Sequence, residues 1–148
     1  MTKDVLVTIS GLQMAVNDME NDNDEPIEIL SAGTYYFKDG THYIFFEEVQ
    51  EGIPGVTKTQ VRLSGNETLE VRKKGIANVN MVFVKNQNNR CFYHTPFGQL
   101  NMGIFTKDIS VKETEDDIQI EAEYALDVDF EPIADCTIQI RVQPKTQN

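Results

Sequence analysis

The sequence is poor in basic residues and contains no tryptophan. Its 148 residues include 13 lysines and arginines against 24 aspartates and glutamates, which gives a net charge of −11. Such a surface repels phosphate backbones and anionic lipid headgroups, because both kinds of binding depend on clustered lysine and arginine. We therefore expect neither a nucleic acid nor a membrane as a partner.

Long apolar runs are also missing. The longest apolar stretches, such as residues 81–84, have the length of a β-strand. They are too short for a signal-peptide core or a membrane span. The length suits one hydrophobic core. We therefore predict one domain over residues 1–148, located in the cytoplasm.

The sequence offers little to a metal ion or a cofactor. Its two cysteines, Cys91 and Cys136, form no C-x-x-C pair, and we expect both to be reduced thiols that pack in the core. The acidic segment 17–25 does not fit a calcium loop, because Asn23 and Ile29 occupy the positions that require Gly and Glu. We predict no metal site and no cofactor.

Catalytic motifs are absent from the sequence as well. It contains no Ser-His-Asp spacing, nucleophile elbow or glycine-rich phosphate loop. The only histidines, His42 and His94, have no ligand cluster near them in the sequence. We predict that the protein is not an enzyme.

What the chain does contain is alternation with a period of two residues, which is typical of strands with one buried and one wet face. The clearest example is an apolar set that faces one way while the residues between its members are mostly acidic: Ile118, Ile120, Ala122, Tyr124, Leu126 and Val128. The final strand candidate repeats the pattern, and no helix-period pattern is present. The pattern indicates an antiparallel sheet.

Similar segments run from end to end, separated by turn residues. The predicted strands are 4–15, 26–38, 41–50, 57–64, 68–74, 77–86, 89–95, 98–112, 117–128 and 132–143. A helix-free meander must protect its edge strands, and closing into a barrel does this most completely. We predict an all-β fold, an antiparallel meander closed into a lipocalin-like barrel of about eight to ten strands. A two-sheet sandwich is the alternative.

Two turns allow a register to be assigned. The Asp39-Gly40 pair is a type I′ signal that places Tyr36 opposite Tyr43, so that both faces of this hairpin carry aromatic side chains. In the hairpin at residues 65–67, a three-residue loop pairs apolar with apolar side chains, among them Val61 with Val71 and Leu63 with Leu69.

The turn at residues 95–98 leaves the register open. A two-residue loop places Tyr93 beside Leu100, whereas a bulge at Gly98 places His94 there. The choice decides which of the two side chains faces inward.

The chain resembles the YwiB-like family of small bacterial proteins of unknown function, on stretches at residues 43–48, 55–59, 81–83 and 93–98. The resemblance covers nearly the whole chain and implies a lipocalin-like (calycin) barrel. Phe97 stands where the family commonly has tyrosine. The absence of tryptophan excludes the G-x-W signature of true lipocalins, so the likeness to ligand carriers is one of shape.

Neighbouring strand residues face opposite ways, so Glu47 and Glu48 cannot act together as an acid–base pair. An inward carboxylate near the barrel mouth needs a partner such as Lys58 or Arg72, or else a raised pKa.

The leading functional hypothesis is a non-enzymatic barrel that binds a small, mainly apolar ligand near the turn at residues 95–98. The predicted lining combines aromatic and Met side chains with a few polar ones: Tyr43, Phe45, Glu48, Arg72, Met81, Phe83, Tyr93, His94 and Phe97. The same side chains could instead fill the core. The rival hypothesis is a protein-interaction or homo-oligomerising domain, such as a homodimer, which the aromatics on both faces of the 39–40 hairpin favour.

Overall fold

The computed structural model describes residues 3–11, 28–50, 52–65, 67–96 and 98–145. Their ten strands are β1 (Lys3–Ser10), β2 (Glu28–Lys38), β3 (Thr41–Gln50), β4 (Ile53–Ser64), β5 (Thr68–Gly75), β6 (Val79–Val84), β7 (Asn88–Thr95), β8 (Gly98–Glu113), β9 (Ile118–Val128) and β10 (Glu131–Pro144). The end of the first predicted strand and the acidic segment 17–25 lie outside the described residues.

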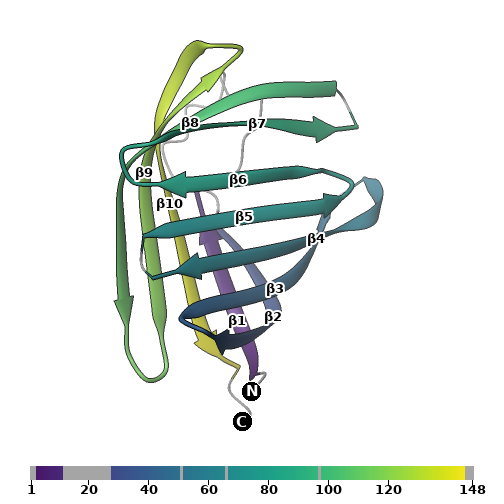
Figure 1. Cartoon of the computed structure of the whole chain (residues 1–148). Helices are drawn as coiled ribbons and strands as arrows, with labels where there is room; N and C mark the ends of the chain where they lie inside the picture. Colours follow the sequence, from purple (N-terminus) through teal and green to yellow (C-terminus); the bar gives the residue numbers. More distant parts are fainter. Residues whose placement is uncertain (1–2, 12–27, 51, 66, 97, 146–148) are drawn as a thin grey trace.

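The strands form one antiparallel sheet in the order β6-β5-β4-β3-β2-β1-β10-β9-β8-β7. Neighbours in the sheet are neighbours in the chain, except that the first and last strands pair and so close the meander. β6 and β7, at the two ends of this order, meet at an isolated bridge in which Asn78 and His94 exchange two backbone hydrogen bonds of 2.9 Å. The predicted all-β antiparallel barrel is therefore confirmed. Figure 1 shows β9 and β10 running across the direction of β4, β5 and β6.

Two hairpins have the strand register that their turn residues predicted. Asp39 and Gly40 have φ angles of 53° and 79°, as a type I′ turn requires, and Tyr36 pairs with Tyr43. Between β4 and β5, Val61 pairs with Val71 and Leu63 with Leu69, which confirms the three-residue loop.

The open register of the β7–β8 hairpin is now decided. Tyr93 lies opposite Leu100, and Thr95 lies opposite Gly98, so the loop has two residues. Tyr93 consequently packs against the core from the inner face, whereas His94 is exposed on the outer face.

The inner faces of the strands meet in one apolar cluster. In the middle of β4 and β5, the side chains of Val61, Leu63, Leu69 and Val71 have no solvent exposure. Phe83 of β6 packs edge-on against Tyr124 of β9 at a ring distance of 5.1 Å. The centre of the barrel is therefore occupied by the protein's own side chains, and polar inward-facing groups lie toward its ends.

Candidate functional site

An inward-facing ion pair lies near one end of the barrel. Lys73 Nζ donates a hydrogen bond to Glu48 Oε1 at 2.7 Å, and the hydroxyl of Thr59 donates to the same oxygen at 2.6 Å. The three residues come from β3, β4 and β5, at the end where the β3–β4, β5–β6 and β7–β8 connections lie (Figure 1). We call these three residues the mouth cluster.

Strand register explains why these polar side chains point inward. Thr59 lies opposite both Phe46 of β3 and Lys73 of β5, and Phe46 is buried. Glu48 and Lys73 each stand two residues beyond a buried apolar side chain, Phe46 and Val71 respectively, so alternation gives them the same inner face. The inward position therefore follows from the same period that builds the core.

The mouth cluster is mostly withdrawn from water. The side chains of Lys73 and Glu48 retain 12% and 18% of their exposure, and Thr59 retains 1%. Taking both charges out of water carries a large desolvation cost that offsets most of their attraction, so such a pair is weak evidence for a purely stabilising role. The pair contacts solvent through the fraction that remains exposed.

Tyr93 adds a phenol beside the mouth cluster. Burial raises the pKa of Tyr93, and the nearby negative charge of Glu48 raises it further. The phenol is therefore protonated at neutral pH and can donate a hydrogen bond. Thr57, the next inward residue of β4, accepts a hydrogen bond from the backbone of Ala77 at 3.4 Å.

A second polar group lies elsewhere on the inner face, where the β2–β3 hairpin approaches the end of β8. The Tyr35 hydroxyl and His42 Nδ1 are 2.7 Å apart, and His42 Nε2 lies 3.5 Å from Glu113 Oε1. His42 is buried, whereas about half of the Glu113 side chain is exposed. Burial raises the pKa of Tyr35, with a smaller contribution from the charge of Glu113. These contacts satisfy the buried imidazole and connect β2, β3 and β8.

Comparison with known proteins agrees with this architecture. Residues 12–140 match the family described as "Domain of unknown function (DUF1934)". The chain belongs to the DUF1934 family. It is 30% identical over 109 residues to the "Uncharacterized beta-barrel protein YwiB" of Bacillus subtilis (strain 168), which covers 74% of this chain and 75% of that protein.

A solved structure shares the fold of this DUF1934 chain. The crystal structure of the ywiB protein from Bacillus subtilis superposes with a TM-score of 0.76 and 21% identity, over 98% of this chain and 94% of the other. At that identity the likeness shows the fold alone. The resemblance recognised from the sequence is confirmed.

The structure places four of the predicted site residues of the DUF1934 chain on the inner face. Glu48 and Tyr93 belong to or adjoin the mouth cluster. Met81 and Phe83 are buried in the apolar cluster. The ninth predicted residue, Phe97, lies outside the described residues.

The remaining four predicted residues stand on the outer face and cannot line the interior. Tyr43 and Phe45 flank inward-facing Ile44, and their rings stack on Tyr36 at 4.7 and 5.8 Å. Arg72 and His94 are exposed beside inward-facing neighbours. Their prediction rested on residue type, and strand alternation overrides it.

Sequence reasoning missed Lys73, the actual partner of Glu48. The two suggested partners, Lys58 and Arg72, are both exposed on the outer face. The register predicted from the three-residue loop already paired Val61 with Val71, and two further residues along the strands it pairs Thr59 with Lys73. The register of this hairpin, extended by one inward-facing pair, therefore identifies Lys73 as an inward-facing residue.

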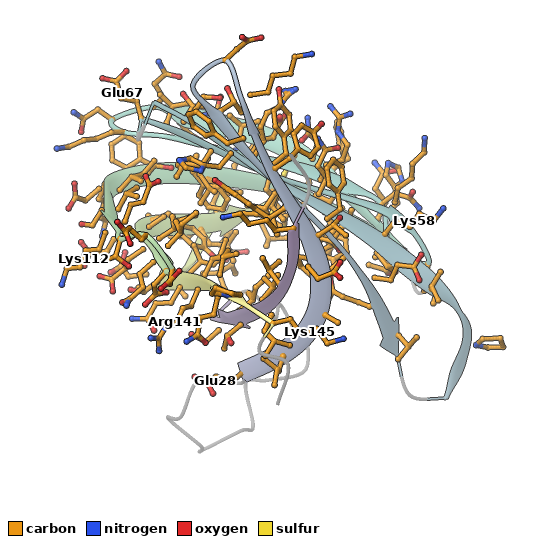
Figure 2. All side chains as sticks on the ribbon, turned by 90° about the horizontal axis from the view of Figure 1, so that it is seen from below. Glu28, Lys58, Glu67, Lys112, Arg141 and Lys145 are labelled. Atoms are coloured by element: carbon orange, nitrogen blue, oxygen red, sulfur yellow. The ribbon has the colours of Figure 1, made fainter. Side chains whose placement is uncertain are left out.

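A separate hollow of about 600 Å³ lies outside the barrel on β1, β2, β8, β9 and β10. Its lining is polar and includes Thr8, Ser110, Lys112, Gln119, Gln139 and Arg141. Figure 2 shows Lys112 and Arg141 pointing away from the barrel, so this hollow is no part of the interior. Hydrogen bonds from Arg141 lower the pKa of Asp117.

Two further observations bear on wider classes of function. Within the described ranges no group of three or more His, Cys, Asp or Glu side chains is arranged to hold a metal ion. No helix among those residues is long and apolar enough to cross a membrane.

Proposed function

We propose that the protein is a non-enzymatic barrel that binds a small, mainly apolar molecule at the mouth cluster. The observation that carries the proposal is the ion pair of Lys73 and Glu48, held on a mostly apolar inner face yet still in contact with solvent. A buried pair of this kind adds little net stability, and recognition of a ligand's polar end is a use that would account for its presence.

The packed centre of the barrel confines the proposed ligand to the mouth. Val71 and Val61, the next inward-facing residues of β5 and β4, are fully buried, while Tyr93 and Leu100 are only partly buried. An apolar body would pack against Tyr93 and Leu100, and its polar end would reach Lys73 and Glu48. This is a binding site rather than a reaction centre, because a protonated phenol and an ammonium held in an ion pair are poor nucleophiles.

The test is titration with a neutral apolar fluorophore, N-phenyl-1-naphthylamine, together with native mass spectrometry of the purified protein. We expect saturable binding that Tyr93→Ala weakens about tenfold or more, as loss of a packed aromatic contact implies. The matched control is Phe92→Ala, one residue away on the outer face and 52% exposed, which should leave binding unchanged. Absence of saturable binding, or equal effects of the two substitutions, would exclude the mouth as a binding site.

Self-association is a second candidate, favoured by exposed aromatic side chains on the outer face. Phe130 is 72% exposed, and the guanidinium of Arg90 lies 3.9 Å from the centre of its ring. Phe92, on the same strand as Arg90, is exposed as well. If a second copy covers this face, light scattering will give a dimer mass that Phe130→Asp reduces to the monomer. A wild-type monomer at high concentration would end this candidate.

A further inference from the structure

We infer that the mouth cluster selects a ligand whose polar end is a neutral group that both donates and accepts hydrogen bonds, such as a primary carboxamide, over a carboxylate. The inference rests on the proposed binding function and adds to it the chemistry of the ligand's polar end. Its basis is the hydrogen-bonding capacity that Lys73 and Glu48 retain after they have bonded to each other.

Glu48 and Lys73 each keep hydrogen-bonding capacity that the bond between them does not use. Glu48 Oε1 accepts from both Lys73 and Thr59, whereas Oε2 has no hydrogen-bond partner among the described residues. An ammonium group has three donors, and Lys73 uses one of them within the described part of the chain. Tyr93 supplies a protonated phenol nearby. The mouth cluster therefore presents a free acceptor next to free donors.

A carboxamide can bond both to the free acceptor and to the free donors of the mouth cluster. Its carbonyl oxygen can accept from Lys73 or Tyr93, and its N–H can donate to Glu48 Oε2. No net charge is brought into the site, so no further ion has to be desolvated.

A carboxylate can bond only to the free donors of the mouth cluster. It would accept from Lys73, but its charge would also lie close to that of Glu48, at about 4–5 Å, because both carboxylates would bond to the same tetrahedral ammonium group, which holds Glu48 at 2.7 Å. Repulsion by Glu48 then offsets more than half of the attraction to Lys73, while the desolvation cost of the new ion remains. Glu48 Oε2 would also be left without a donor. The loss of one such hydrogen bond corresponds to about tenfold in Kd.

The experiment is competition between two matched ligands, octanamide and octanoate, for bound N-phenyl-1-naphthylamine at neutral pH. We expect the wild-type protein to prefer octanamide by about tenfold. Glu48→Gln removes the repelling charge and leaves Lys73 uncompensated, so the preference should reverse toward octanoate. Glu47→Gln, on the outer face of the same strand, is the matched control and should keep the wild-type preference.

Each outcome decides a separate question. A wild-type protein that binds octanoate as tightly as octanamide overturns the selectivity while leaving the binding function in place. A Glu48→Gln protein that is folded by circular dichroism and still prefers octanamide overturns it as well. If the fluorophore itself does not bind, the proposed function fails and the selectivity fails with it. Should Glu48→Gln not fold, the wild-type preference alone gives the answer.

Discussion

Replacing Lys73 by methionine should destabilise the protein far more than replacing the neighbouring Arg72 by methionine. At the observed 2.7 Å between Lys73 Nζ and Glu48 Oε1, two unit charges attract by about 6 kcal/mol at an effective dielectric constant of roughly 20. Desolvation of the two ions costs several kcal/mol each, so the net contribution of the intact pair is close to zero.

Removing one partner leaves the desolvation cost of the other uncompensated. In Lys73→Met, Glu48 keeps only the hydrogen bond from Thr59 and stays mostly buried. Breaking a fully buried pair costs about 3–5 kcal/mol, and we expect about 3 kcal/mol because both side chains keep some exposure. The double variant Lys73→Met with Glu48→Met removes both charges, so its free energy of unfolding should lie within about 1 kcal/mol of the wild-type value.

The assay is urea unfolding followed by circular dichroism, with all variants in one double-mutant cycle. The matched control is Arg72→Met, on the same strand but with 54% of its side chain exposed and an ion-pair distance of 4.0 Å to Glu70. It should lose less than about 1 kcal/mol. The reasoning is refuted if Lys73→Met costs no more than Arg72→Met, or if the double variant loses the sum of the two single losses.

Three further predictions follow from packing and titration. Phe83→Ala, which empties a fully buried position, should lower the free energy of unfolding by about 3–5 kcal/mol in the same assay, and a loss below 1 kcal/mol would contradict the packing. Burial raises the pKa of the Cys91 thiol to about 11, against a smaller lowering by Arg90. In a Cys136→Ser background, iodoacetamide should therefore react with Cys91 of the native protein only as pH approaches that value, and a native rate that rises near the ordinary thiol pKa would refute the burial. Arg141 lowers the pKa of Asp117, so this carboxylate stabilises the fold above its unfolded pKa and loses the effect as pH falls through its folded pKa. Asp117→Asn should thus be less stable than wild type at neutral pH and equally stable in strong acid, as urea titrations at several pH values would show; a difference that persists in acid would exclude the linkage.

The sequence was informative wherever a property depends on a few consecutive residues. The alternation from Ile118 to Val128 identified a strand and its buried face, and the Asp39-Gly40 pair identified a turn and its register. Residue type is a weaker guide to the direction of a strand side chain than alternation is. Aromatic character predicts an interior position for Tyr43 and Phe45, although inward-facing Ile44 lies between them. Aromatic side chains stack equally well on the outer face of a sheet, so their chemistry alone does not report direction.

Strand identity, strand direction and the faces of most side chains were therefore determined by the sequence alone, because a period of two residues and a tight turn are local properties. Tertiary structure alone decided which inward-facing groups from separate strands meet. Glu48 reaches Lys73 across an intervening strand, and Tyr93 approaches them from the far end of the sheet order. Whether such side chains meet depends on the registers of several strand pairs taken together and on the curvature that closes the barrel. No single stretch of the chain determines these.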